Sequence, residues 1–394
     1  MIKKKEIDWD DRSIDSHDFE VEKEDFYSED QNNEDEEKPF DADKIRVDAK
    51  PFSVRQMQDM IKDKQLNLAP GFQRRKVWKE RKRKSLLIES LMLRIPLPVF
   101  YVYEDEYSIW HVVDGLQRMS TIDDYLNGKF KLNGLQYLKH SNGKLFSELD
   151  SKYKTRITTT TLTANVIDSR TPLQVKYDIF RRINTGGVPL NAQEIRNSTA
   201  KPKTRKFLKD MVRSEEFQNV TDGKINDLRM EAQELVIRFI AFFDAFDPKT
   251  EKVKYKKSME TFIDEAFDKI NNASDEQLKK YKYLFINAMK NADKMFGKYA
   301  FRRLDLADIS NSESRLKPYN KSLFTCESVI LAHYSNKEVE KIDWGTTAIE
   351  ELANNLSKNV EFNEALTKGT ADPSRINIQF IIMSKIIRRL MNDC

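Results

Sequence analysis

The sequence predicts an α+β domain followed by a mostly α-helical domain, behind an acidic N-terminal arm. Three observations support this prediction. Residues 1–43 carry 18 acidic and 6 basic side chains. Residues 46–200 mix β-rich runs with amphipathic helical stretches, whereas the chain beyond residue 200 is almost wholly amphipathic with helical spacing. We therefore expect an acidic disordered arm over 1–45, an α+β domain over 46–200 and a helical domain over 201–394.

The arm has few large apolar side chains and a dense acidic run, Glu34-Asp-Glu-Glu37. Such a segment cannot bury enough apolar surface to offset its ordering entropy. Two interpretations stay open, a solubilising arm and an arm that covers a basic surface and competes with a polyanion. Residues 44–394 carry a net charge of +16, which the overall +4 hides. This asymmetry favours nucleic acid or another polyanion as a partner.

Elements of the α+β domain follow from apolar spacing and from turn residues. The predicted helix at Phe52 to Gln65 has Ser53 as its N-cap and Met57, Met60 and Ile61 on one face. Further helices are expected at 81–93, 119–127 and 172–183, and β-rich runs at 99–103, 109–113 and 158–167, the first two joined by the hairpin-like connection 104–108. In the second domain, helices are expected near 203–213, 228–246, 258–271, 275–295, 319–335, 346–357 and 375–392.

Composition excludes several classes of protein. Two cysteines, Cys326 and Cys394, form no disulfide framework or cysteine-rich zinc site. No apolar run approaches the roughly 18 residues of a membrane span, and no apolar stretch follows the basic start. These features indicate a cytoplasmic protein with no membrane partner.

The sequence lacks the motifs that are typical of most enzyme classes. The four histidines, His17, His111, His140 and His333, are scattered without ligand spacing, so we predict no metal site. His111 lies in a β-rich run, where a hydrogen-bonded structural histidine is favoured over a catalytic base. No glycine-rich phosphate loop that ends in Lys-Ser or Lys-Thr is present.

The most informative segment surrounds Gly115. A β-rich run ends at Asp114, Gly115 permits a tight turn, and an amphipathic helix begins within four residues. This arrangement directs backbone N–H groups and the positive end of a helix dipole at one point, which suits phosphate or carboxylate. Arg118 adds a charge-assisted contact and Gln117 a neutral one. Asp114 is a candidate to accept from a sugar hydroxyl, orient a water or hold a metal ion. The alternative is a common Asp-Gly turn that only starts a helix.

A basic cluster lies between residues 74 and 84, with eight basic residues and one acid. One interpretation is a phosphate-contacting surface with an aromatic stacking platform. The predicted nucleic-acid contacts are Arg75, Lys76, Trp78, Lys79, Arg81, Lys82, Arg83 and Lys84. The alternative is a solvated helix face. Gln73 and Arg74 directly precede the cluster, and a second arginine near Arg118 would complete an anion clamp.

A third cluster begins at Asn184-Thr-Gly-Gly, which is typical of a helix end and loop. Asn191 and Glu194 then form a predicted capping box at the start of the next helix. Taken alone, this structural interpretation is favoured over one in which Arg181, Arg182 and Arg196 face a ligand.

Together and in this order, the three clusters resemble the GmrSD-type restriction-system N-terminal domain family, within the ParB/sulfiredoxin-like superfamily. The family's usual marks stand here as Gln73-Arg74 followed by Trp78, as Asp114-Gly-Leu-Gln-Arg118, and as Asn184-Thr-Gly-Gly leading into Leu190-Asn-Ala-Gln-Glu-Ile-Arg196. The resemblance covers residues 50–200 well and the helical remainder more weakly.

The resemblance implies a ParB-like α+β fold that binds a nucleoside triphosphate, with Mg²⁺ as the accompanying ion. In characterised relatives, NTP hydrolysis is coupled to recognising or cutting modified or foreign DNA. Carried onto this chain, the pocket would be lined by Gln73, Arg74, Asp114, Gly115, Gln117 and Arg118. Asp114, Gln117 and Arg118 would then be the catalytic residues.

Two departures from the family pattern shape the functional prediction. Leu116 stands where the family usually has a glutamine, which puts hydrolysis in doubt more than binding. Relatives that cleave DNA carry a His-Asn-His nuclease module, which the dispersed histidines do not form. We therefore expect a nucleotide-binding, NTP-hydrolysing restriction or phage-defence component that acts on DNA with a nuclease or methyltransferase partner. The alternatives are a non-catalytic DNA-binding regulator or defence subunit and a helical scaffold with a vestigial pocket.

Overall fold

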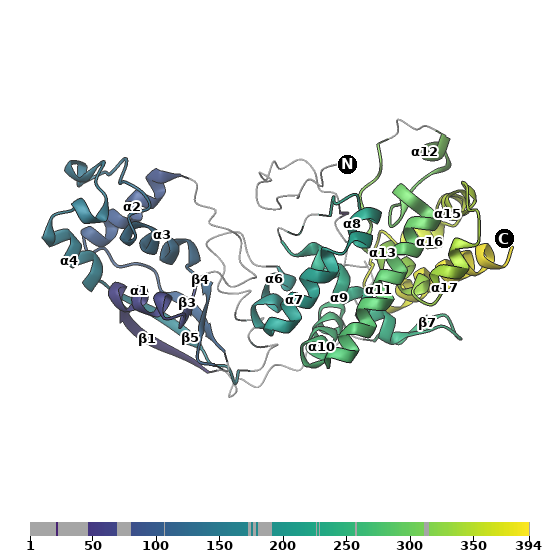
Figure 1. The fold of residues 1–394 in the computed structure, drawn as a ribbon, viewed down its shortest axis with the longest axis horizontal. Helices are drawn as coiled ribbons and strands as arrows, with labels where there is room; N and C mark the ends of the chain where they lie inside the picture. Colours follow the sequence, from purple (N-terminus) through teal and green to yellow (C-terminus); the bar gives the residue numbers. More distant parts are fainter. Residues whose placement is uncertain are drawn as a thin grey trace, which may run out of the picture. The chain divides into compact units, whose positions relative to one another are not determined.

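The computed structural model describes residues 21–22, 46–68, 80–105, 107–171, 175, 179, 191–225, 227, 229–256, 258–310 and 315–393 (Figure 1). Its contacts divide the chain into two compact units. The sheet unit comprises Asn33–Arg205 with Leu228–Met230, and the helical unit comprises Lys206–Asp227 and Glu231–Cys394 with the segment Met1–Asn32. In the described ranges, no helix has the length and apolar character needed to cross a membrane.

The sheet unit is built on a mixed five-stranded sheet with strand order β1-β5-β3-β4-β2. Its strands are β1 (Val47–Ser53), β2 (Leu66–Asn67), β3 (Phe100–Glu104), β4 (Trp110–Asp114) and β5 (Thr161–Ile167). Its helices are α1 (Val54–Lys62), α2 (Arg81–Met92), α3 (Leu116–Leu126), α4 (Ser151–Thr159) and α6 (Ala192–Thr199). β3 pairs antiparallel with β4 and parallel with β5, and β1 pairs antiparallel with β5. The predicted α+β fold is confirmed.

One face of the sheet carries the main core of this unit, against α1 to α4 (Figure 1). Alternate residues of the central strands point into it, as the two-residue period of a strand requires. The central buried members are Phe100 and Val102 of β3, Trp110 and Val112 of β4, Ala164 and Val166 of β5, Met57 of α1, Ile88 and Leu91 of α2, Met119 and Ile122 of α3, and Ile157 of α4. This core fixes where β4 ends and α3 begins.

Two local predictions are confirmed in this unit. Ser53 caps α1 in a capping box, since its Oγ accepts the Gln56 N–H while the Gln56 side chain accepts the Ser53 N–H. The connection between β3 and β4 is a hairpin, in which the Asp105 carboxylate accepts the N–H groups of Tyr107 and Ile109.

The start of the first predicted helix was wrong, because Phe52 and Ser53 belong to strand β1. Residues 47–51 are exposed and include Pro51, so they show no apolar alternation. Among the described strands, β1 lies at the edge of the sheet and pairs only with β5. Proline is tolerated at such an edge because one side of the strand needs no ladder hydrogen bond.

The predicted β-rich run at 158–167 also began too early. Thr158 and Thr159 close helix α4, and the strand begins at Thr161. The hydroxyls of Thr158, Thr159 and Thr160 each donate to the carbonyl four residues back, at 3.0, 2.8 and 2.7 Å. These threonines are β-branched, which suggested a strand in the sequence. Their hydroxyls instead hydrogen-bond to backbone carbonyls of the preceding helical turn. Most of the predicted helix at 172–183 lies outside the described residues.

The helical unit contains the end of α7 (Pro202–Val212) and the helices that follow. They are α8 (Glu215–Val220), α9 (Glu231–Ala245), α10 (Met259–Asn272), α11 (Asp275–Phe296), α12 (Leu306–Ser310), α13 (Lys321–Leu331), α14 (Asn336–Glu340), α15 (Thr347–Lys358), α16 (Val360–Ala365) and α17 (Pro373–Asp393). A short hairpin of β6 (Phe246–Asp247) and β7 (Lys252–Val253) lies between α9 and α10.

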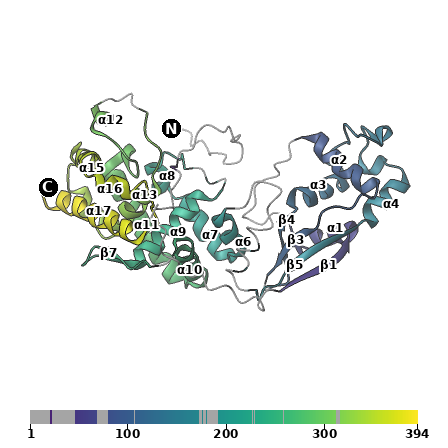
Figure 2. The same ribbon diagram turned by 180° about the vertical axis from the view of Figure 1, so that it is seen from behind.

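Helix α13 is the centre of the helical unit. Every residue from Ser322 to Leu331 is buried. The helix packs against α9, α11 and α17, and it lies among these helices in both views (Figures 1 and 2). The N-terminus of α13 is therefore held in place by the core of the unit.

Glu327 of α13 makes folding stability depend on pH. Burial raises the pKa of its carboxyl to about 8, although the Phe301 N–H, which donates to Oε2 at 2.9 Å, acts in the opposite direction. The folded state therefore keeps the proton over a pH range in which the unfolded state loses it, so stability should fall as pH rises from about 4.5 to about 8.

We expect Glu327→Gln to remove this dependence. The native chain should lose up to about 1.4 kcal/mol of unfolding free energy per pH unit relative to the variant. Urea unfolding of both proteins at pH 6, 7 and 8 measures the difference. Parallel pH dependences would show that Glu327 does not titrate in this range.

Candidate functional site

The turn between β4 and α3 is the candidate site, and Gly115 is its pivot. Gly115 has φ +95° and ψ 7°, in the left-handed region, and serves as the N-cap of α3. Its carbonyl accepts the Met119 N–H at 2.9 Å, the first hydrogen bond of the helix. The helix thus begins directly after the glycine, three residues before the predicted start at 119.

Packing gives a second reason for glycine at this position. A Cβ atom on Gly115 would lie 2.3 Å from Cδ1 of Phe100 and 3.0 Å from a terminal nitrogen of Arg118. Phe100 is buried in the main core and cannot move away. Backbone conformation and close contact together exclude a larger residue.

Arg118 lies in the first turn of α3 and is held by three acceptors. Nη1 donates to the Pro98 carbonyl at 2.5 Å, and Nη2 donates to the Val99 carbonyl at 3.2 Å and to Oδ2 of Asp114 at 3.0 Å. Its guanidinium carbon lies 4.4 Å from the centroid of the Phe100 ring. The side chain is therefore preorganised rather than free in solvent, at an exposed fraction of 14%.

Burial and a neighbouring carboxylate act in opposite directions on the charge of Arg118. Burial lowers the pKa of the Arg118 guanidinium, and the Asp114 carboxylate partly restores it. An arginine remains a cation under such a shift, because its ordinary pKa is far above neutral. Asp114 uses Oδ2 for this contact and keeps 36% of its side chain exposed. Among the described residues, none donates a hydrogen bond to its Oδ1.

The N-cap of α3 is Gly115, which has no side chain with which to cap the backbone amides of the first turn. Backbone N–H groups at the positive end of a helix dipole favour an anion. Gln117 occupies the second position of this turn. Leu116 occupies the first, and it is partly buried against the main core. The turn thus combines helix amides, a fixed guanidinium and a half-exposed carboxylate, a combination suited to phosphate groups.

The structure brings together Asp114, Gly115, Gln117 and Arg118. Gln73 and Arg74, the other predicted pocket residues, lie outside the described residues. The same is true of Arg75, Lys76, Trp78 and Lys79 in the basic cluster.

The rest of the basic cluster opens α2, where Arg81, Lys82 and Arg83 are exposed and Lys84 is partly buried. No acidic residue lies in the first turn of this helix, and Glu80 at the N-cap makes no side-chain capping bond within the described ranges. Basic side chains at the positive end of a helix dipole are unfavourable. A bound polyanion would relieve this repulsion.

The third cluster is described from Asn191 onward, and Asn184-Thr-Gly-Gly lies outside the described residues. Asn191 and Glu194 form the predicted capping box, with both hydrogen bonds at 2.7 Å. Glu194 also pairs with Arg229 at 3.1 Å. Arg196 is 2% exposed, so this arginine faces the interior of the unit. These contacts give the described part of the cluster a structural role.

A polar cluster on the opposite face of the sheet was not predicted. The His111 Nε2 lies 2.7 Å from Oδ2 of Asp105, and its Nδ1 lies 3.5 Å from Nδ2 of Asn67. The neighbouring Tyr103 ring stacks on the imidazole at 6.1 Å. Burial raises the pKa of Asp105, but the hydrogen bonds from His111 and from two backbone amides outweigh it, so the net shift is downward.

The alternation of side chains along β3 and β4 could have predicted this cluster. Tyr103 and His111 are direct partners in the β3–β4 register, so their side chains must share a face. Both ring nitrogens of His111 have neighbours, and the imidazole links the hairpin to β2. This geometry agrees with the prediction of a structural histidine rather than a catalytic base.

The fold and the turn define a class: an α+β domain with a strand–glycine–helix turn of the anion-binding type. Residues 56–201 match the family described as GmrSD restriction endonuclease, N-terminal domain. This part of the chain is therefore a domain of that family, and the predicted resemblance is confirmed. The match connects the chain to restriction systems. No curated protein matches the chain.

Proposed function

We propose that this chain is the nucleotide-binding component of a restriction or phage-defence system, with the nucleotide phosphates held at the Gly115 turn. One observation carries the proposal: the first turn of α3 presents its backbone amides beside the fixed guanidinium of Arg118. The family of residues 56–201 gives independent support for a role in restriction.

Each residue of the turn has a distinct role in this proposal. The amides that follow Gly115 contact the phosphates, and Arg118 contributes the charge that fixes them. Gln117 adds a neutral contact. The resemblance to the family supports Gln73 and Arg74 as the remaining residues of the pocket. Asp114 orients a water or a nucleotide-bound Mg²⁺ through Oδ1, while Oδ2 holds Arg118.

DNA is the proposed partner of the basic cluster. Arg81, Lys82, Arg83 and Lys84 at the start of α2 would contact phosphates, together with the basic residues and Trp78 that precede the helix. Nucleotide state would then alter how firmly this surface holds DNA. DNA cleavage is assigned to a separate nuclease subunit, with a methyltransferase as the other candidate partner.

A second candidate is a non-catalytic DNA-binding subunit with the same fold. Leu116 favours it, because this side chain packs on the core where the family usually has a polar glutamine. A pocket that lacks this contact retains the helix amides and Arg118, which suffice for binding but give less control of an attacking water.

Phosphate release from each of the four common NTPs, with and without DNA, separates the two candidates. We expect the native chain to release phosphate and Asp114→Ala to lose at least about 100-fold in rate, the effect of removing a group that positions the nucleophile. Asp123→Ala, in helix α3 that follows the turn, is the control. Nucleotide binding without turnover would select the non-catalytic subunit.

Deleting residues 1–43 should tighten DNA binding, because these residues carry a net charge of −12 that competes with phosphates for basic side chains. We expect affinity to rise roughly three- to tenfold at 50 mM salt and the gain to shrink above about 150 mM, where screening is stronger. Fluorescence anisotropy with a labelled duplex measures both. Equal affinities at low salt would reduce the arm to a solubilising segment.

A further inference from the structure

Val21 and Glu22 lie against the helical unit, although the sequence predicted a disordered arm over 1–45. Val21 is 8% exposed and forms a parallel bridge with Tyr319. The Glu22 N–H donates to the Tyr319 carbonyl at 2.8 Å. Tyr319 also forms an antiparallel bridge with Arg302, so Tyr319 is bridged to both Val21 and Arg302. These two residues therefore make defined backbone contacts within the segment predicted to be disordered.

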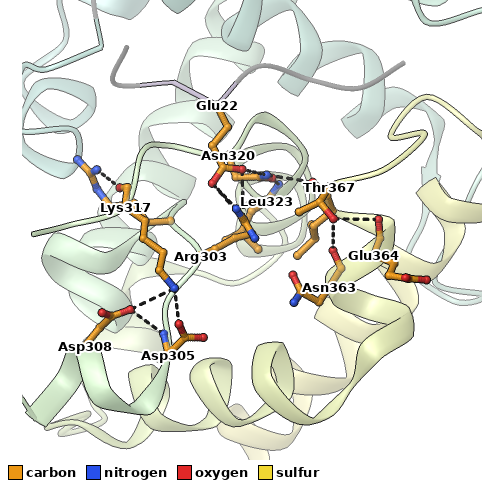
Figure 3. A network of polar contacts seen from close by, with 12 residues as sticks. Glu22, Arg303, Asp305, Asp308, Lys317, Asn320, Leu323, Asn363, Glu364 and Thr367 are labelled. Atoms are coloured by element: carbon orange, nitrogen blue, oxygen red, sulfur yellow. Dashed lines mark hydrogen bonds and ion pairs between the residues drawn. The ribbon is translucent and has the colours of Figure 1, made fainter. Parts of the chain in front are cut away.

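The Glu22 carboxylate contacts two side chains of the helical unit (Figure 3). Arg303 donates to it in a forked geometry, from Nε at 3.0 Å and from Nη2 at 2.9 Å, both to Oε1, with a longer Nε contact of 3.2 Å to Oε2. Asn320 donates from Nδ2 to Oε2 at 2.7 Å. Both carboxylate oxygens are therefore recognised, and paired contacts of this kind are among the strong, specific hydrogen bonds in proteins.

The receiving residues are positioned by contacts of their own. Asn320 is the N-cap of α13, since its Oδ1 accepts the Leu323 N–H at 2.8 Å, and its Nδ2 also donates to the Leu366 carbonyl at 3.0 Å. The guanidinium of Arg302 lies 3.5 Å from the centroid of the Tyr319 ring and is almost fully buried. The positive end of the central helix, an amide donor and a backbone acceptor are thus held in place without the arm.

Local charge favours a peptide carboxylate over nucleic acid. The neighbouring Lys317 pairs with Asp305 and with Asp308, at 3.4 Å for Asp308. A phosphate backbone would meet these two carboxylates beside Arg303. A single carboxylate on an extended backbone meets the arginine, the asparagine and the Tyr319 carbonyl without that repulsion.

We propose that the N-terminus of α13 is a recognition site for an extended peptide segment with an apolar residue followed by a glutamate, and that Val21–Glu22 occupies this site within the same chain. The segment binds by strand addition, with main-chain hydrogen bonds for affinity and the Glu22 contacts for specificity. The acidic arm is thereby latched to the helical unit, and an acidic segment of a partner protein can bind only by displacing it.

A labelled peptide of residues 15–28 tests the proposal on the full-length chain. The native chain should bind the peptide weakly, because its own arm competes at the high effective concentration of a tethered segment. Full-length Glu22→Gln should bind the same peptide at least about tenfold more tightly. A peptide with Glu22→Gln should fail on that protein, whereas a charge-matched Glu24→Gln peptide should bind like the native peptide.

Hydrogen–deuterium exchange on the full-length chain gives an independent measure. The Glu22 amide should be protected in the native chain and in Glu24→Gln, and should lose protection in Glu22→Gln. Loss of peptide binding on adding Arg303→Met to the Glu22→Gln chain, with its melting temperature retained, would support the assigned contact. Equal binding of the native and Glu22→Gln peptides, or an unprotected Glu22 amide in the native chain, would overturn the proposal.

Discussion

Arg118→Ala should abolish nucleotide binding, with a loss of affinity of about 100-fold or more. Truncating one partner of a hydrogen-bonded charge pair costs roughly 2–5 kcal/mol, and Arg118 is the described cation in the first turn of α3 that would face the phosphates. Isothermal titration of the native chain and the variant with the same NTP measures the difference.

The variant must also be separated from a folding defect. Arg118 holds the Pro98 and Val99 carbonyls, so its loss should lower the melting temperature as well. Arg156→Ala is the matched control, because Arg156 also donates to a backbone carbonyl, that of Met92 at 3.0 Å, but lies in α4. We expect the control to bind nucleotide like the native chain. Unchanged binding by folded Arg118→Ala would remove Arg118 from the pocket.

Glu89→Ala should destabilise the sheet unit by about 3–5 kcal/mol. Glu89 of α2 is 3% exposed, and its carboxylate accepts three successive backbone amides, from Gln136, Tyr137 and Leu138, at 3.0, 2.8 and 2.7 Å. Truncation leaves these N–H groups without their charged acceptor, and breaking such a buried network is among the costliest single changes.

Glu148→Ala provides the control for Glu89. The Glu148 carboxylate accepts one exposed backbone amide, that of Leu145 at 2.7 Å. Its removal should cost about 1 kcal/mol or less, as for an exposed cap. Denaturant unfolding of both variants compares them. Similar losses of stability would show that the segment at 136–138 does not depend on Glu89.

Most of the fold could be predicted because apolar spacing and capping residues carry strong local information. The hairpin of β3 and β4, the caps at Ser53 and Asn191 and the long helices of the helical unit all follow from such patterns. Edge strand β1 did not, because an exposed strand that contains Pro51 has no apolar alternation. The threonines at 158–160 misled the prediction because their hydroxyls bond to the backbone of the preceding helix turn.

The sequence predicted which residues form the candidate site, but not the contacts that hold them in place. The sequence indicated Asp114, Gly115, Gln117 and Arg118 as neighbours of one turn. It did not indicate that Arg118 would be held by the Pro98 and Val99 carbonyls, because those contacts depend on how β3 enters the sheet. The contact of Glu22 with Arg303 could not be predicted from the sequence either, since it joins residues 281 positions apart.

Hydrogen–deuterium exchange at the Gly115 turn tests the central claim most directly. The amides of Leu116 and Arg118 precede the first hydrogen bond of α3, which the Met119 N–H makes, so they should exchange quickly without nucleotide. A saturating NTP should slow their exchange and leave the N-terminus of α13 unchanged. Unaltered exchange at these two amides under saturation, or protection confined to the helical unit, would contradict a nucleotide site at this turn.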